Sequence, residues 1–177
     1  MATTKPRVDA RGMQSFGIAS PKDMLEKLRF EVEQPPPGSG QREMKFAGIN
    51  IAVTAWHLTE WIAVELTKTN RWPEAAKVLK FNFPQQNAED REKAFMDYEK
   101  GDSPEMEAAE SIANASKHRE RRINLFNGNV HTPDGSQTIQ IIVLRDGGVH
   151  GMDVSHFGNE LIKRLERTMR QLGIATE

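Results

Sequence analysis

The segment from Glu43 to Lys68, EMKFAGINIAVTAWHLTEWIAVELTK, decides the fold of this chain. Its apolar side chains recur every three or four residues and it contains no proline, a pattern that predicts a long amphipathic α-helix. Successive residues of an α-helix are rotated by about 100°, so one face of this helix contains Phe46, Asn50, Val53, His57, Glu60, Trp61 and Val64. Asn70 and Pro73 mark its end. A helix this long and apolar is expected to lie at the centre of the domain.

Helix-start signals place further helices on both sides of this segment. Ser20-Pro21 and Ser103-Pro104 each combine an N-cap residue with a proline suited to the first helical turn. Helices are predicted at 20–34, 87–100, 103–122 and 156–172, and a short helix is predicted within 71–86. The last helix is expected to be capped by Ser155 and to end at Gly173.

The apolar period changes after residue 122. A stretch rich in β-branched residues, 137–144, predicts a strand, and Asp146-Gly147-Gly148 predicts the turn that leads to a return strand at 149–154. Residues 123–126 predict a further short strand. The predicted class is α+β and helix-dominated: a helical bundle with a small antiparallel β-hairpin or three-strand unit and a closing C-terminal helix.

Composition divides the chain into unequal parts. Residues 1–19 show no period and are expected to form a flexible arm, because they offer too little apolar surface to offset the entropy of ordering. The N-terminal helix at 20–34 is followed by a Pro/Gly/Ser linker at 35–42. Residues 43–177 are expected to form a single compact domain.

Length and composition exclude several classes of protein. The 177 residues include no cysteine and carry a net charge of -1. Disulfide frameworks, thiolate metal sites and cysteine nucleophiles are therefore excluded, and the bulk charge gives no reason to expect a general nucleic-acid or membrane binder. We expect no cofactor, no metal ion and no membrane segment, and a cytoplasmic location.

The first candidate site lies on the long helix. His57 and Glu60 are three residues apart and therefore neighbours on the helix surface, where a carboxylate would raise the basicity of the imidazole. This pair suits general base catalysis or metal ligation. The alternative is a structural role, in which a buried His–Glu hydrogen bond specifies packing and Asn50, Trp56 and Trp61 belong to a polar core.

The second candidate site lies on the helix that begins at Ser103. Asn114, Lys117 and His118 share one face and together suit the binding of a phosphate or a carboxylate, although a solvated face is the alternative. Arg119, Arg121 and Arg122 follow, so that residues 117–122 carry a net charge of +3. The preceding residues 89–110 contain nine acidic and three basic residues, which gives that stretch a net charge of -6.

The sequences of the two clusters resemble sequences found in another group of proteins. The His-Leu-x-acid-Trp sequence at His57–Trp61 and the later Asn-x-Ser-Lys-His sequence at Asn114–His118 resemble a group of small bacterial and phage helical proteins of unassigned function, over residues 44–172. The resemblance implies one site shared by two neighbouring helices. These proteins are loosely similar to HEPN domains, which include RNases. The HEPN signature Arg-x4–6-His is absent before His118, and the match from Arg145 to His150 falls in the predicted hairpin.

The favoured function is a small cytoplasmic binding protein of bacterial or phage origin that acts through the polar-basic helix face of the second site. Its partner would be a protein or a nucleic acid, with a role in phage–host conflict by association, and the long helix also allows a homodimer. The alternative is a His-dependent hydrolase or HEPN-like RNase. In that case His57 and His118 would act as base and acid, Glu60 would orient His57, and Lys117 would stabilise an anionic transition state.

Overall fold

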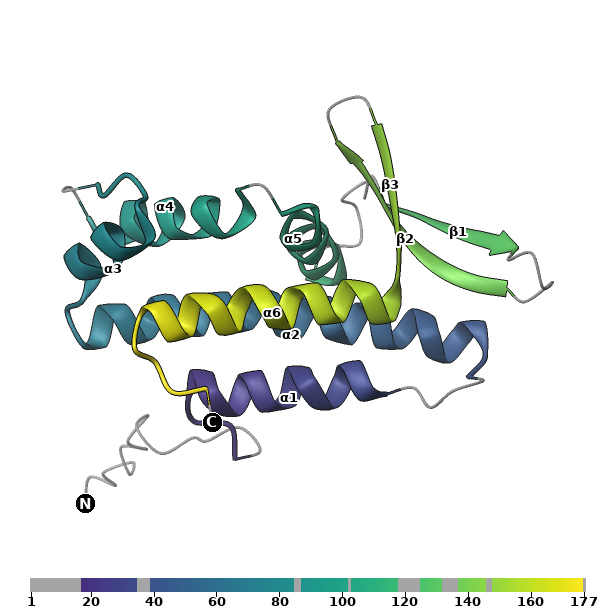
Figure 1. The fold of residues 1–177 in the computed structure, drawn as a ribbon, viewed down its shortest axis with the longest axis horizontal. Coiled ribbons are helices and arrows are strands. Elements are labelled where there is room, and N and C mark those ends of the chain that lie inside the picture. Colours follow the sequence, from purple (N-terminus) through teal and green to yellow (C-terminus); the bar gives the residue numbers. More distant parts are fainter. Residues whose placement is uncertain are drawn as a thin grey trace, which may run out of the picture.

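The computed structural model describes residues 17–34, 39–84, 87–101, 103–117, 125–131, 137–145 and 148–176. Within these ranges the chain forms six helices and three strands, shown in Figure 1. The helices are α1 (Pro21–Glu33), α2 (Gln41–Lys68), α3 (Trp72–Leu79), α4 (Ala88–Lys100), α5 (Pro104–Lys117) and α6 (Val154–Gln171). The helix-dominated class predicted from the sequence is confirmed.

The strands β1 (Leu125–His131), β2 (Gln137–Arg145) and β3 (Gly148–Asp153) form one antiparallel sheet in the order β1-β2-β3. Ile141 of β2 pairs with Met152 of β3, and both side chains are buried. These two residues belong to the same apolar core as the helices, and β2 contacts α2 and α6. The sheet is therefore anchored to the bundle through its central strand and the start of α6.

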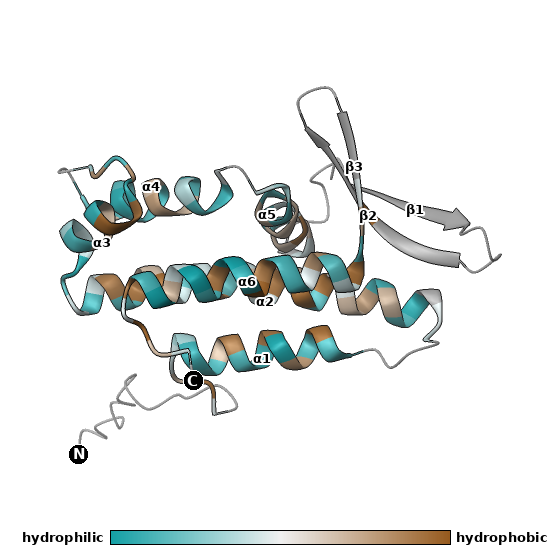
Figure 2. Ribbon diagram, viewed as in Figure 1, coloured by the Kyte–Doolittle hydropathy of each residue, from teal (hydrophilic) through white to brown (hydrophobic). Residues whose placement is uncertain are grey.

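Two long helices, α2 and α6, run side by side through the middle of the bundle (Figure 1). Helix α1 packs against both of them, and α5 packs against α2 on another side. Figure 2 shows apolar and polar residues alternating along α1, α2 and α6, as expected of amphipathic helices. The fully buried side chains include Leu25 and Leu28 of α1, Ile51, Leu58 and Ile62 of α2, and Phe157, Leu161, Leu165 and Met169 of α6.

Helix α1 is part of the same core as the rest of the bundle. Arg29 donates hydrogen bonds to Glu166 of α6 and to the Thr176 carbonyl near the C-terminal end, at 2.7 Å and 3.2 Å for its closest contacts. Gly158 of α6 allows the two helices to approach closely, because a Cβ at this position would overlap the Val32 side chain of α1. The compact domain therefore begins at α1, before residue 43.

Local capping follows the sequence at the starts of α1 and α5. Ser20 accepts a hydrogen bond from the Asp23 amide, and Ser103 accepts one from the Met106 amide, as the Ser-Pro signals predict. The start of α6 differs, since Asp153 rather than Ser155 accepts the capping bond, from the His156 amide at 2.8 Å. A charged Asp cap also complements the helix dipole. The helix begins at Val154, two residues earlier than a Ser155 cap would allow.

Candidate functional site

The first predicted cluster lies on the outer face of α2. Helices α1, α5 and α6 pack against the remaining sides of α2. His57 and Glu60 are partly buried on this face, whereas Phe46 and Val64 are exposed at 52% and 47% of their surface. We call the residues of this face the α2 stripe, and it consists of Phe46, Asn50, Val53, His57, Glu60, Trp61 and Val64.

The structural alternative placed the polar residues of the α2 stripe in a buried core, and the structure places this face outward instead. Asn50, assigned to a polar core from the sequence, is exposed. The buried side of α2 is the opposite arc, with Ile51, Ala55, Leu58 and Ile62. This arc combines large aliphatic side chains with alanines, so neighbouring helices approach it more closely than they could approach the aromatic stripe. Periodicity alone could not choose between two apolar arcs on one helix.

The tryptophans of the predicted polar core occupy different positions. Trp56 is buried and belongs to the hydrophobic core. Trp61 is partly buried and packs against the core from the α2 stripe. Among the described residues, no hydrogen bond is found for the indole nitrogen of either side chain, so each acts through its apolar ring.

His57 and Glu60 are neighbours on the helix but are not coupled in the structure. No hydrogen bond or ion pair joins them within the described segments. The same segments contain no group of three histidine or acidic side chains placed to hold a metal ion. The pair therefore presents two separate polar groups on an open helix face, an arrangement that suits hydrogen bonding to another surface.

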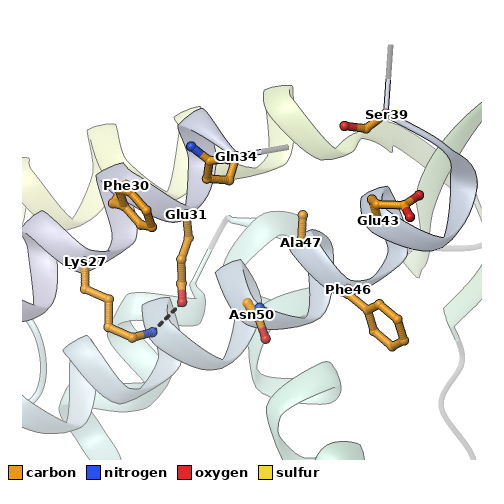
Figure 3. A pocket seen from close by; sticks show the side chains of 9 residues that line it. All are labelled: Lys27, Phe30, Glu31, Gln34, Ser39, Glu43, Phe46, Ala47 and Asn50. Atoms are coloured by element: carbon orange, nitrogen blue, oxygen red, sulfur yellow. Dashed lines mark hydrogen bonds and ion pairs between the residues drawn. The ribbon is translucent and has the colours of Figure 1, made fainter. Parts of the chain in front are cut away.

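A pocket of about 710 Å³ opens beside the N-terminal half of the stripe, between α1 and α2 (Figure 3). Phe30 of α1, which is 62% exposed, and Phe46 of α2 provide its aromatic walls. Lys27 donates hydrogen bonds to Glu31 and to Thr54 and so ties the two helices together below the pocket. The full lining is Lys27, Phe30, Glu31, Gln34, Ser39, Glu43, Phe46, Ala47 and Asn50.

One atom in this pocket lacks a partner. The second carboxylate oxygen of Glu31, Oε2, is buried, and it accepts no hydrogen bond in the part of the chain that the structure describes. A buried acceptor left unsatisfied costs about 1–3 kcal/mol relative to one that is paired. This oxygen is itself shielded from solvent, so the exposed Phe30 and Phe46 rings determine what fits, and the pocket favours a ligand group with an apolar body.

The second predicted cluster is placed only in part. Asn114 is partly buried on α5, and Lys117 is the last residue of that helix. His118, Arg119, Arg121 and Arg122 lie outside the described residues, so the question of whether His57 and His118 share a site also lies outside them. One turn earlier, Glu110 pairs with Lys100 of α4 at 3.2 Å.

The structure also contains a buried polar group that the sequence did not reveal. Glu99 of α4 is completely buried, and its carboxylate accepts hydrogen bonds from Thr168 at 2.8 Å and from Arg164 at 3.2 Å, both on α6. Arg164 also donates to the Tyr98 carbonyl. Burial raises the pKa of Glu99 despite the nearby guanidinium. Because its side-chain partners both lie on α6, we assign this group to the joining of α4 and α6.

Sequence signals for Glu99 are weak. It is one of several acidic residues in a polar helix, and only its position one turn from the apolar pair Phe95 and Met96 places it on the buried side. Arg164 and Thr168 are four residues apart on α6, so they face Glu99 together. The pairing between the two helices depends on tertiary packing, which a single sequence does not encode locally.

Comparison with known proteins adds no family. No protein-family model matches the chain, and neither a curated protein nor a solved structure matches it significantly. No helix among the described segments combines the length and the apolar character that crossing a membrane requires.

Proposed function

We propose that this protein is a binding protein that associates with another polypeptide through the α2 stripe and the adjoining pocket. The observation that carries the proposal is the exposure of large apolar side chains along one face of α2 and at the pocket that this face shares with α1. Phe30, Phe46 and Val64 are exposed by about half or more, and Val53 and Trp61 lie between the last two. Exposed apolar patches on this scale are typical of sites where proteins associate.

The polar residues of the stripe support the same function. Asn50, His57 and Glu60 alternate with the apolar residues, and none of them is committed to a hydrogen bond with another described residue. Interfaces commonly combine apolar anchors with polar groups that fix the alignment of the two partners. The stripe thus offers both kinds of contact to a polypeptide surface.

The polar-basic stretch at 117–122 remains part of this proposal only as a source of charge. Its net charge of +3 would favour a partner that presents an acidic surface near the end of α5.

The catalytic alternative has less support, because His57 lacks a coupled carboxylate and faces outward on an open helix. General base catalysis requires groups within hydrogen-bond reach of the reacting proton.

A photo-crosslinking experiment tests the proposal. A photoreactive phenylalanine analogue is placed at position 64 in the stripe and, as a matched control, at position 78, where Val78 is 40% exposed on α3. We expect crosslinks to a polypeptide from position 64 and at least tenfold fewer from position 78. Equal yields at the two positions, or none at either, would contradict the proposal.

A further inference from the structure

The residues of the α2 stripe other than Trp61 follow a heptad spacing. Phe46, Asn50, Val53, His57, Glu60 and Val64 are separated by four, three, four, three and four residues. This alternation is the spacing of a and d positions in a coiled coil, where the seam of one helix packs into that of a second helix. With a rise of about 1.5 Å per residue, the seam from residue 46 to residue 64 is about 27 Å long.

We infer that the partner of this surface is a second copy of the same chain, packed antiparallel along α2. The inference rests on the proposed function, since it identifies the polypeptide that the stripe binds. A two-fold axis across the middle of the seam would bring each a position beside a d position of the other copy. The seam would then be shared equally by the two chains.

The residues that this arrangement brings together are complementary. Phe46 meets Val64 of the second copy, which covers the two most exposed apolar side chains of the stripe. Asn50 meets Glu60, so that an amide N–H can donate to a carboxylate, and Val53 meets the His57 ring. Each layer therefore pairs either two apolar groups, a donor with an acceptor, or an apolar group with an aromatic ring.

Charge favours the antiparallel direction over the parallel one. In a parallel pair, Glu60 would lie beside Glu60 of the other copy, and His57 beside His57. The ends of α2 carry both signs, with Arg42 and Glu43 at one end and Glu65 and Lys68 at the other. An antiparallel pair brings opposite charges within reach at both ends, whereas like charges placed side by side cost free energy.

The pocket between α1 and α2 fits the same arrangement. Trp61 lies on the α1 side of the seam, and the two-fold axis places Trp61 of the second copy level with Ile49, next to Asn50 at the mouth of the pocket. Figure 3 shows Asn50, Glu31 and Phe30 around this space. An indole is a large apolar ring, which suits the aromatic walls that Phe30 and Phe46 give this pocket.

The absence of cysteine from the chain makes a direct test simple. Asn50→Cys and Glu60→Cys are prepared as two separate variants, each with a single thiol, and oxidised alone and as an equal mixture. We expect a disulfide-linked dimer only in the mixture. Two copies of residue 50 would lie about 15 Å apart along the seam, beyond the reach of a disulfide. Val78→Cys, on α3, serves as the control for random collisions.

Each other outcome overturns the inference in a recognisable way. Disulfides in each variant alone, but fewer in the mixture, would mean a parallel pair. No disulfide above the Val78→Cys level would mean that the second copy does not dock on α2. In that case, crosslinks from position 64 to a different polypeptide would leave the proposed function intact, and their absence would remove both.

A second measurement covers the case in which a cysteine substitution itself disturbs the seam. Sedimentation of Phe46→Ser/Val64→Ser should show dimer dissociation at a concentration at least tenfold above that of the unchanged chain. Val78→Ser should sediment like the unchanged chain. A chain that is monomeric at every concentration, or an effect of equal size at Val78, would overturn the inference.

Discussion

Two polar regions of this bundle differ in how their groups are satisfied. On α6, Arg164 and Thr168 hold the buried Glu99 carboxylate of α4, so the polar groups satisfy one another inside the protein. On α2, Asn50 and His57 face outward with no described partner. The first arrangement is closed and joins two helices. The second leaves its hydrogen-bonding capacity for another molecule, which is why we assign stability to the first region and association to the second.

The largest effect is expected from breaking the closed region. Arg164→Ala removes the guanidinium beside the buried Glu99 and should lower the free energy of unfolding by about 3 kcal/mol, since a buried carboxylate would lose its charge partner. Urea denaturation measures this change. Lys163→Ala, at an exposed neighbouring position, is the control and should change stability by less than about 0.5 kcal/mol. Equal effects would mean that Glu99 does not depend on Arg164.

A steric test examines how tightly the same helix is packed. Gly158→Ala should destabilise the protein by about 1–3 kcal/mol, because the added methyl group would overlap Val32 of α1. Gly48→Ala in α2 is the matched control, since a Cβ there meets Val154 at an ordinary distance of 3.6 Å. It should be neutral or stabilising by up to about 1 kcal/mol. Thermal unfolding of both variants measures the two changes in stability. A larger loss of stability from Gly48→Ala than from Gly158→Ala would contradict this packing.

The next largest effect is expected in the pH dependence of stability, through the titration of Glu99. Its pKa is raised in the folded state, so the folded protein holds this proton more tightly than the unfolded chain does. The stability that protonated Glu99 contributes is therefore fully present below the pKa of this group in the unfolded chain. It is lost as the pH rises through the pKa of the group in the folded protein. Unfolding free energies measured from pH 4 upward should fall relative to Glu99→Gln by at most about 1.4 kcal/mol per pH unit. Parallel curves for the two proteins would show that burial does not raise this pKa.

The smallest change in stability is expected on the α2 stripe. His57→Ala and Glu60→Ala should each alter the unfolding free energy of the monomer by less than about 0.5 kcal/mol, because neither side chain is hydrogen-bonded to the other or fully buried. Urea denaturation at low protein concentration measures this. A loss above about 2 kcal/mol for either variant would place the pair in the structural core after all.

Much of the bundle could be predicted from the sequence because its signals are local. The Ser20 and Ser103 caps and the Gly173 stop depend on residues within one helical turn of each other. The orientation of α2 was not predicted, because the helix is apolar on two arcs and only its neighbours determine which arc is buried. Glu99 escaped prediction for the same reason, as its partners are 65 and 69 residues away in the sequence.

Association of the protein should cover the α2 stripe. The most direct measurement is the rate at which diethyl pyrocarbonate modifies His57, resolved by mass spectrometry, as the protein concentration rises. His156 is exposed on α6 and is the internal control. We expect His57 to become at least fivefold less reactive while His156 keeps its rate. Equal rates for His57 at all concentrations, in a protein that sediments as a dimer, would contradict the claim.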